Sequence, residues 1–441
     1  MKYSNLNVIE INEISRIVKE KQPSLFKQIC IFIGQLFYYT FIVHFKYKSL
    51  PVNYKGLLFF GVSLNNRRSL EPIINNIEKD TYLYLNNHIT DVHKRRAWWH
   101  SIPYLSTLIK LYKKSNKEDK ALILKYFTRL LTTYGLYEIA GEMLDKYKVK
   151  VLVLANDHND INRCLIFNAL ERGIKTVYVQ HASVKKGFPR LDFTYSFLDG
   201  KESLEKYFYA GIPKGEVYLS GGVRFDFLYD KIVKRNYDVK KIGVAINMLD
   251  DFDKVKKLCL FLKNNNYHDL ILRPHPRYQH LNTEWLIKNN IAISNPKEES
   301  SFDFISKIDF MISNESAIHL DASIMYCPTV LFNMSANFIG TQQATSLLDD
   351  YNFVKNNLVK LANTEDELLK FIKNPREVMP TKETLQYYNA SSNTHLEGKL
   401  GSTIARFLEL VCQGKEKQFD KGSGFVKNSV LFHEIDDSFA K

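Results

Sequence analysis

A loop in the second half of the chain combines cationic side chains with two prolines. It occupies positions 270–277, LILRPHPR, where Arg273, His275 and Arg277 alternate with prolines, the second of which is Pro276. Because proline fixes φ, such a loop presents its polar side chains in a restricted geometry. A guanidinium fork suits a phosphate group, and a histidine can donate a hydrogen bond to a phosphate oxygen. The segment predicts a phosphate-binding loop, with a rigid turn carrying an exposed histidine as the alternative.

A second loop places hydroxyl groups before a helical pattern. Residues 310–317, FMISNESA, run from an apolar strand toward a helix expected at 318–325, and the polar positions between them are Ser313, Asn314, Glu315 and Ser316. Hydroxyl groups and free backbone N–H groups at the start of a helix bind anions without a metal. Capping of the helix by Ser313 or Asn314 alone is the alternative. The neighbouring arginine loop favours a phosphate site.

Acid–base groups follow two strands of the first half. Asp157 and His158 come after the apolar run 149–155, and His181 comes after the run 176–180. Group transfer to a hydroxyl acceptor needs a base that takes the hydroxyl proton, and a carboxylate or an imidazole serves this purpose. Asp157 and His181 are therefore the catalytic candidates. Helix capping by Asp157 and a purely structural His181 are the alternatives.

A glycine pair marks a further strand end. Gly221 and Gly222 follow the predicted strand 216–219, and Arg224 comes directly behind them. Glycines after a strand let the backbone approach a ligand closely. The spacing lacks the full GxGxxG pattern of dinucleotide sites, and the sequence has no GxxxxGK[ST], HExxH or GxSxG motif. We therefore expect no bound metal and no cofactor, and we place these three residues with His158 around the site.

Buried strands alternating with helices must position these loops. In the first half, the run 149–155 leads into a helix that stops at Gly173, and the strand 176–180 follows. A second series of short apolar runs and helices covers 242–332, and one long helix is expected at 384–412. Continuous apolar runs are typical of strands buried on both faces of a parallel sheet. This order predicts an α/β chain with doubly wound, Rossmann-like domains, whose ligands bind at the carboxyl ends of the strands.

Changes of composition divide the chain into five segments. We expect a helical, membrane-proximal segment at 1–50, a first Rossmann-like domain at 51–235, a second one at 236–385, a C-terminal helix at 386–415 and a tail at 416–441. The phosphate-binding loops fall in the second domain, and the acid–base residues fall in the first. The sequence thus assigns the two kinds of chemistry to different domains.

The overall charge limits the partners of this chain. Its 441 residues include 61 Lys and Arg against 48 Asp and Glu, a net charge of +13. A generally basic surface explains this excess, and so does an anionic partner such as membrane headgroups, a nucleotide or an acidic polymer. Zinc-finger spacing, RNP-like aromatic motifs and a concentrated basic arm are absent from the sequence, so we expect no nucleic-acid partner. Five scattered cysteines without a CxxC pair indicate a reducing compartment, the cytoplasm.

One stretch of the sequence leaves membrane contact open. Residues 29–45 are almost entirely apolar, with Gln35 and His44 as interruptions, and the polar opening of the chain contains no secretory signal. The stretch is shorter than the roughly 20 residues of a membrane span. A buried helix, a helix lying in the plane of the bilayer surface and a transmembrane helix all remain as interpretations. The second would make the protein peripheral at the inner face of the cell membrane.

Several of these residues occur in an order that resembles bacterial cell-surface polysaccharide transferases of the GT-B fold. The order is QHAS at 180–183, Pro189, Asp192, GGVRFD at 221–226, RPHPR at 273–277 and ISNES at 312–316. This group includes capsule and lipopolysaccharide sialyl- and Kdo-type transferases and the polyol-phosphate transferases of teichoic acid synthesis. The resemblance implies two Rossmann-like domains that face a cleft, with a C-terminal helix packing back.

The resemblance also implies roles for single residues. In sialyltransferase-like members, an HP motif and a paired-serine motif hold the CMP of the donor, and here they correspond to His275–Pro276 and to Ser313 with Ser316. Two residues separate these serines, whereas the family often has adjacent ones. The carboxylate base of those enzymes lies in an acidic-glycine motif, to which Asp157 is the nearest analogue, although the glycine is missing. The polyol-phosphate transferases instead use a histidine after a first-domain strand, which His181 matches in part.

The function implied by this resemblance is a glycosyltransferase of capsule or lipopolysaccharide biosynthesis. It would transfer a sugar, with a CMP-activated acidic sugar as the leading choice, to a glycan hydroxyl by metal-independent inverting displacement. The expected partners are a nucleotide-sugar donor and a glycan or lipid-linked glycan acceptor. A CDP-polyol phosphotransferase of the teichoic-acid type and a non-catalytic assembly or export factor are the alternatives, and a nucleotide-sugar epimerase is a third.

Overall fold

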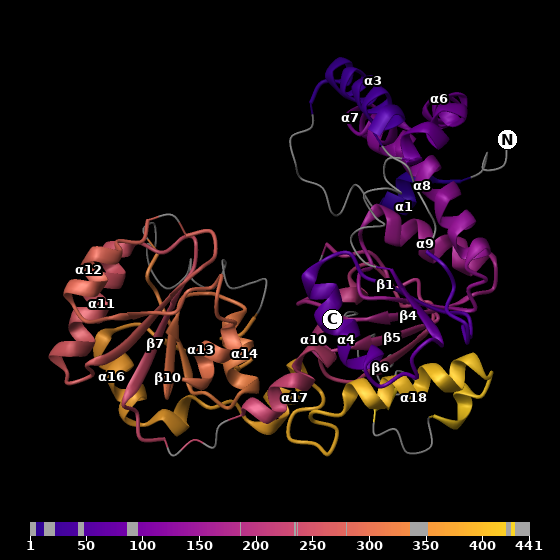
Figure 1. The fold of residues 1–441 in the computed structure, drawn as a ribbon. Helices are drawn as coiled ribbons and strands as arrows, with labels where there is room; N and C mark the ends of the chain where they lie inside the picture. The colour runs from indigo at the N-terminus through magenta and orange to yellow at the C-terminus, as the bar shows by residue number, and fades with distance from the viewer. Residues whose placement is uncertain are drawn as a thin grey trace. The chain divides into compact units, whose positions relative to one another are not determined.

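The chain forms two compact α/β units. The computed structural model describes residues 6–12, 23–42, 48–85, 96–185, 187–232, 235, 237–278, 280–335, 352–419 and 425–427. One unit consists of Met1–Arg224 with Lys399–Lys441, and the other of Phe225–Gly398. Each unit is built around a sheet of its own (Figure 1).

The first unit contains a seven-stranded sheet in the order β13-β6-β5-β4-β3-β1-β2. Its strands are β1 (Leu57–Phe60), β2 (Tyr82–Leu85), β3 (Val151–Leu154), β4 (Lys175–Val179), β5 (Tyr195–Leu198), β6 (Glu216–Leu219) and β13 (Val426–Lys427). The pairs among β1 to β6 are parallel, and β13 is antiparallel to β6. Strands β1 and β3 are buried at every position, which explains their uninterrupted apolar sequences. The order of the strands along the chain reverses between β1 and β3.

Helices on this sheet include α4 (Leu64–Ile74), α9 (Asp160–Glu171), α10 (Lys201–Phe208) and α18 (Leu400–Cys412). Helix α4 begins with a capping box in which Ser63 and Asn66 bond each other's backbone, and the chain leaves α9 through Gly173 at φ +67°. The C-terminal helix α18 contacts α4 and β3 (Figure 1). The predicted return of a C-terminal helix onto the first domain is therefore confirmed.

A group of helices at one end of the first unit surrounds α8 (Phe127–Lys146). Its members are α1 (Val8–Asn12), α3 (Leu25–Ile42), the 3₁₀ turn η1 (Ile102–Tyr104), α6 (Leu105–Lys114) and α7 (Lys117–Lys125). They share an apolar cluster that includes Val8, Leu108, Ile123 and Leu130, against which Phe32 packs. Among the described residues, none of the helices combines the length and the apolar character that crossing a membrane requires. The final residues 43–45 of the apolar stretch lie outside the described part of the chain.

The second unit contains a six-stranded, wholly parallel sheet in the order β12-β11-β10-β7-β8-β9. Its strands are β7 (Lys241–Ile246), β8 (Asp269–Pro274), β9 (Ala292–Ile293), β10 (Phe310–Ser313), β11 (Thr329–Phe332) and β12 (Lys360–Ala362). Its helices are α11 (Phe252–Asn264), α12 (Thr283–Lys288), α13 (Ser301–Ser306), α14 (Ile318–Ile324), α16 (Glu365–Lys373) and α17 (Lys382–Tyr388). The 3₁₀ turns of the chain also include η2 (Val223–Lys231), η4 (Pro375–Val378) and η5 (Glu416–Gln418).

Successive residues of the central strands of this sheet point into two separate cores. On β10, Met311 packs with α13 and α14, whereas Phe310 and Ile312 pack with α11 and the other helices of the opposite face. A sheet covered by helices on both faces is the doubly wound arrangement. The expected fold class, α/β with two doubly wound, Rossmann-like domains, is confirmed.

Several sequence-based expectations need correction. The single helix expected at 384–412 is two helices, α17 and α18, because the Ser- and Asn-rich segment between them forms turns and includes Gly398 at φ +73°. Strands β2 and β5 were not expected, and neither was β12. The tail expected at 416–441 contributes the short strand β13 to the sheet, and residues 428–441 lie outside the described part.

Candidate functional site

The reversal of strand order places two loops of the first unit side by side. Ligands of doubly wound sheets bind at such a reversal, beyond the carboxyl ends of the two strands. Here the loops follow β1 and β3, which pair in parallel with Phe60 beside Leu154. Asn66 Nδ2, in the first turn of α4 directly after the first loop, donates to the Ala155 carbonyl oxygen of the second loop over 3.1 Å. The loop after β3, which contains Asn156, Asp157 and His158, therefore lies at the edge of the sheet where a ligand is expected.

Asp157 and His158 form a hydrogen-bonded pair in this loop. Asp157 Oδ1 lies 2.8 Å from His158 Nδ1, and Tyr207 of α10 donates its hydroxyl to Asp157 Oδ2 over 2.6 Å. The Asp157 side chain is wholly buried, whereas the side chain of His158 is 23% exposed. Asp157 can orient the imidazole, but it has no surface of its own to offer a substrate.

The loop itself is held by one asparagine. Asn156 Oδ1 accepts hydrogen bonds from the backbone N–H groups of His158 and Asn159 and from Asn162 Nδ2, over 2.9–3.1 Å. Asn156 Nδ2 lies 3.5 Å from His158 Nε2. These contacts hold the His158 ring on both sides. They agree with a tautomer that carries its proton on Nδ1 and has an unprotonated Nε2, which faces Asn156 Nδ2 at that long distance.

Burial and hydrogen bonding set the charge states of Asp157 and His181. Burial alone would raise the pKa of Asp157, but the hydrogen bonds from His158 and Tyr207 outweigh it, so the pKa lies below its ordinary value. Burial lowers the pKa of His181 to about 4. His181 is therefore neutral near pH 7, and its ring lies 6.2 Å from that of His158. Its buried Nδ1 has no hydrogen-bond partner among the described residues.

The remaining predicted residues of the first unit lie at the ends of β5 and β6. Arg224 binds Asp199 through two hydrogen bonds of 3.0 and 2.5 Å, and burial raises the pKa of Asp199 although Arg224 opposes this. Gly221 has φ +91°, a backbone conformation that favours glycine, and Gly222 is buried beside it. Arg224 thus has an internal ion-pair role that its sequence context did not indicate.

The second unit has its own reversal of strand order, between β7 and β10. Four polar residues from three strand ends meet there. Asn314 Nδ2 donates to Asp250 Oδ1 over 2.7 Å and to Ser335 Oγ over 2.6 Å, and Asn247 Nδ2 donates to the Glu315 carbonyl over 3.0 Å. Asp250 is buried, which raises its pKa although Asn314 and the Asn247 backbone oppose this. Sequence reasoning missed Asn247 and Asp250, although the rule that polar residues follow strands applies to the end of β7.

Arg273 lies inside the second unit. Its guanidinium donates to Ser294 Oγ over 2.7 Å and to the Glu299 carbonyl over 3.0 Å, and it lies over the ring of Phe304. The side chain is 9% exposed. These contacts give Arg273 a structural role. Its strand β8 lies next to β7, which separates it from β10, whereas the sequence predicted that β8 and β10 would be neighbours.

His275, Pro276 and Arg277 lie nearer the surface than Arg273. His275 is partly exposed, and Pro276 and Arg277 are exposed. His275 Nδ1 accepts a hydrogen bond from the Arg277 backbone N–H over 3.1 Å. Burial and the charge of Arg277 lower the pKa of His275. A neutral ring with an acceptor Nδ1 carries its proton on Nε2, which can donate to a ligand.

The serine loop at the end of β10 also contains both a buried residue and residues nearer the surface. Ser313 Oγ is buried and donates to the Ala245 carbonyl over 2.8 Å, whereas Glu315 and Ser316 are partly exposed. Helix α14 begins at Ile318 with Ala317 as its N-cap residue and no side-chain cap. Neither Ser313 nor Asn314 caps this helix, so that alternative is wrong. Because β8 and β10 both pair in parallel with β7, the two predicted loops do lie at the same edge of the sheet.

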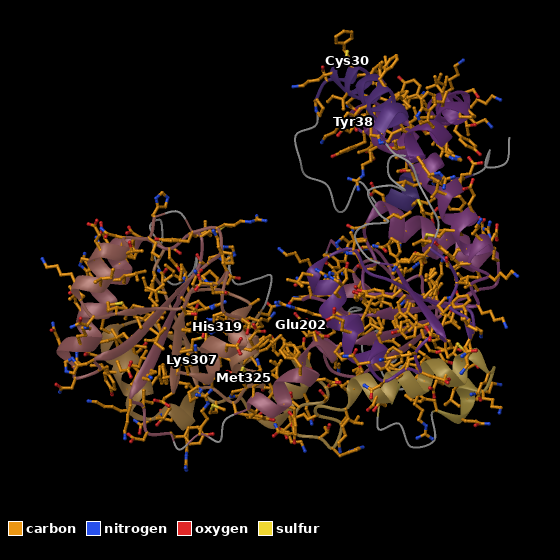
Figure 2. All side chains as sticks on the ribbon, viewed as in Figure 1. Cys30, Tyr38, Glu202, Lys307, His319 and Met325 are labelled. Atoms are coloured by element: carbon orange, nitrogen blue, oxygen red, sulfur yellow. The ribbon has the colours of Figure 1, made fainter. Side chains whose placement is uncertain are left out.

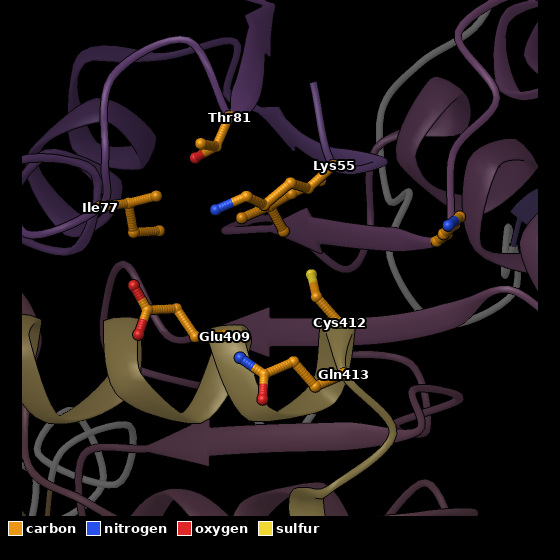
Figure 3. Close-up of a pocket in the computed structure, with 8 residues that line it drawn as sticks. Lys55, Ile77, Thr81, Glu409, Cys412 and Gln413 are labelled. Carbon is orange, nitrogen blue, oxygen red and sulfur yellow. The ribbon is translucent and has the colours of Figure 1, made fainter. Parts of the chain in front are cut away.

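Two other features of the first unit lie apart from this site. A cavity of about 470 Å³ is lined by residues that include Lys55, Leu57, Lys150, Glu409 and Cys412 (Figure 3). Lys55 and Lys150 precede β1 and β3, so the cavity is at the opposite edge of the sheet from Asp157.

The second feature is a group of potential metal ligands on the helices around α8. His100, Glu138 and Glu142 offer ligand atoms within 4.8 Å of one another. Arg96 binds Glu142 over 2.9 Å and lies 3.5 Å from His100 Nε2. The guanidinium of Arg96 already supplies a positive charge next to these groups, so we assign no metal to them.

Comparisons with known proteins give structural likeness without sequence likeness. No protein-family model matches the sequence, and no curated protein matches it. A UDP-GlcNAc 2-epimerase from Neisseria meningitidis bound to UDP-GlcNAc is 11% identical with a TM-score of 0.48, covering 81% of this chain and 99% of that one. A UDP-GlcNAc 2-epimerase from Methanocaldococcus jannaschii is 14% identical with a TM-score of 0.47, covering 80% and 99%. A variant of the wall teichoic acid polymerase TagF is 12% identical with a TM-score of 0.47, covering 89% and 98%. At these identities and TM-scores the likeness indicates no substrate and no reaction for this chain.

Proposed function

We propose that this chain is a glycosyltransferase of cell-surface polysaccharide synthesis, acting in the cytoplasm on capsule or lipopolysaccharide. It would transfer a sugar from a nucleotide-activated donor, a CMP-activated acidic sugar as the first choice, to a glycan or lipid-linked glycan hydroxyl. The observation that carries the proposal is the Asp157–His158 pair at the carboxyl edge of the first sheet. A buried carboxylate behind a partly exposed imidazole is an arrangement suited to general-base catalysis.

His158 is the base in this proposal. As the acceptor oxygen forms its bond to the anomeric carbon, the bond from that carbon to the donor phosphate breaks, and the hydroxyl proton moves to His158 Nε2. Asp157 accepts a hydrogen bond from Nδ1, so it holds the required tautomer and stabilises the imidazolium that results. Tyr207 keeps the carboxylate oriented through its hydrogen bond. The burial of Asp157 makes it a positioning residue in this mechanism.

Donor binding is assigned to the second unit. Arg277 and the Nε2–H group of His275 would bind the phosphate of the nucleotide, with Ser316 supplying a hydroxyl donor. Charge develops on the phosphate oxygen as the sugar leaves, and such donors stabilise it in place, an effect of several kcal/mol in comparable sites. The network of the buried Asp250 and Asn314 with the partly exposed Asn247 would support the backbone of this edge rather than bind the phosphate.

The test is a donor panel on the purified chain. Thermal unfolding is followed with CMP, CDP, UDP and GDP, because a ligand that binds the folded state raises the unfolding temperature. Turnover is then measured with CMP-sugars and with CDP-polyols in the presence of glycan acceptors. A shift by CMP together with turnover of a CMP-sugar supports the proposal. No shift with any nucleotide, and no turnover, would overturn it in favour of a non-catalytic factor.

Polyol-phosphate transfer from a CDP-polyol is the second candidate. The observation that favours it is His181, whose buried Nδ1 has no hydrogen-bond partner among the described residues and whose ring is neutral near pH 7. Turnover of a CDP-polyol that is lost in His181→Gln and kept in His158→Gln would establish this candidate. The opposite pattern, with CMP-sugars as donors, would establish the first.

A further inference from the structure

Helix α3 carries a stripe of apolar side chains on its solvent side. Phe26, Ile29, Ile33 and Phe37 recur at intervals of three and four residues, so they share one face of the helix. Their exposed fractions are 79%, 38%, 47% and 66%. The opposite face is used inside the unit, where Gln28 donates to the Lys125 carbonyl and the Phe32 ring lies 4.9 Å from that of Trp98 in a tilted contact. Figure 2 labels Cys30 and Tyr38 on the same helix.

Helix α6, which packs in the same group around α8, repeats this arrangement and adds positive charge. Its exposed apolar side chains, together with the preceding turn, are Ile102, Leu105 and Ile109, each about two-fifths exposed. The exposed lysines Lys110, Lys113 and Lys114 lie on the adjoining side of the same helix. An apolar ridge bordered by lysines is the pattern of helices that lie in the plane of a membrane surface.

The charge of helices α3, α6 and α7 indicates what kind of partner covers them. Helices α3, α6 and α7 together contain seven lysines and two acidic residues, Glu118 and Asp119. A second copy of the chain related by twofold symmetry would bring the same lysines against one another. An anionic lipid surface would meet them with the opposite charge and would accept the apolar stripe at the boundary of its acyl chains.

We propose that α3 and α6 dock the first unit onto an anionic lipid bilayer, with the α3 stripe inserted at the headgroup boundary and the lysines on lipid phosphates. The docking is peripheral, in keeping with the absence of a membrane-spanning helix among the described residues. It does not rest on the proposed transfer reaction. An enzyme with any activity on a lipid-linked acceptor, or with none, would dock in the same way.

The test is sedimentation of the purified full-length chain with vesicles. We expect binding to vesicles of phosphatidylglycerol and phosphatidylcholine, a loss of binding as salt is raised, and at least tenfold weaker binding to phosphatidylcholine alone. The variant Phe26→Glu with Phe37→Glu should lose at least tenfold in partitioning. The matched control is Leu260→Glu with Ile287→Glu, which changes two exposed apolar residues of the second unit and should bind as the natural chain does.

A second pair of variants separates charge from apolar insertion. Lys110→Gln, Lys113→Gln and Lys114→Gln together should weaken binding at least tenfold and reduce its salt dependence. The control changes three exposed lysines of the second unit, Lys288, Lys297 and Lys373, to Gln and should leave binding unchanged. Circular dichroism of every variant reports whether it is folded.

Three results would overturn the proposal. The first is equal binding to charged and uncharged vesicles, and the second is undiminished binding by both the α3 and the α6 variants. The third is a dimer by light scattering that the Phe26→Glu and Phe37→Glu changes convert into monomer, with no vesicle binding by either form. That result would assign the stripe to a second copy of the chain. Turnover of a soluble acceptor is measured in parallel, so a failure of docking is distinguishable from a failure of the proposed activity.

Discussion

His158 Nδ1 lies 2.8 Å from Oδ1 of the wholly buried Asp157. The two residues are adjacent in the chain, so this contact requires the loop after β3 to turn the imidazole back over the carboxylate. The hydrogen bonds that Asn156 accepts produce that turn. As a result the carboxylate is hidden and the imidazole is the group of this loop that a substrate can reach.

The first prediction concerns this pair. His158→Gln should lower kcat by about 100- to 10,000-fold, because the general base is lost, and should leave nucleotide binding unchanged. Asp157→Asn should lower kcat in the same direction, since an amide favours the wrong tautomer of His158. Steady-state turnover and nucleotide titration measure the two effects. His268→Gln, a change of an exposed histidine in the second unit, is the control, and full turnover by both site variants would contradict the assignment.

The second prediction separates two arginines of one loop. Arg273→Leu should lower the free energy of unfolding by about 2–3 kcal/mol, because it removes buried hydrogen bonds to Ser294 and the Glu299 carbonyl. Arg277→Leu should change it by no more than about 0.5 kcal/mol, since this side chain is exposed. In nucleotide titrations Arg277→Leu should weaken binding about tenfold and should have the larger effect of the two variants. Equal losses of affinity without any loss of stability would mean that both arginines bind the donor.

The sequence located the strand ends well and the contacts between them poorly. Runs such as those of β3, β6 and β10 are visible because strands buried on both faces are uninterrupted apolar segments. Strand β2 escapes this rule because its residues alternate between buried and half-buried at the edge of the sheet, and β5 escapes it because Ser196 interrupts the run. The rule therefore finds strands with an uninterrupted apolar sequence and misses both the edge strand β2 and the central strand β5.

The candidate site shows the same division. Asp157, His158 and His181 could be predicted because they directly follow strands. Tyr207 could not, because it reaches Asp157 from α10 across 50 positions of sequence and no local pattern marks it. The internal role of Arg273 was equally hidden, since its partner Ser294 belongs to a loop of its own after β9. Asp250 follows β7, so the same rule could have predicted it.

The third prediction compares two helical glycines. A Cβ atom at Gly135 of α8 would lie 2.0 Å from the Ala97 carbonyl oxygen, a backbone atom, whereas one at Gly34 of α3 would meet nothing within 4 Å. Alanine is the better helix former by about 1 kcal/mol, so propensity alone predicts stabilisation at both positions. We expect Gly34→Ala to be neutral or stabilising and Gly135→Ala to destabilise by about 2 kcal/mol, because backbone must move. Chemical denaturation checks both, and stabilisation by Gly135→Ala would contradict the close packing of α8.

The fourth prediction concerns stability in acid. Burial lowers the pKa of His319 to about 4, and its ring nitrogens lie 2.7 Å from Thr329 Oγ1 and 3.0 Å from the Asn314 carbonyl oxygen. Figure 2 labels His319 in the second unit. In the unfolded chain a histidine titrates near pH 6.5. Above that value neither state binds the proton, so His319 adds no pH dependence there.

As the pH falls from about 6.5 to about 4, the unfolded state takes up the proton and the folded state does not, so the free energy of unfolding falls by about 1.4 kcal/mol per pH unit for this histidine. His181, with its pKa also near 4, adds a similar slope in the first unit. His319→Gln should therefore flatten the decline in stability over this window, while His268→Gln should leave it as it is. Urea denaturation at intervals between pH 7.5 and pH 4.5 measures the slope. If His319→Gln and the natural chain lose stability in parallel, then His319 takes up a proton in the folded protein and the interior of the second unit is more open to solvent at α14 than its contacts indicate.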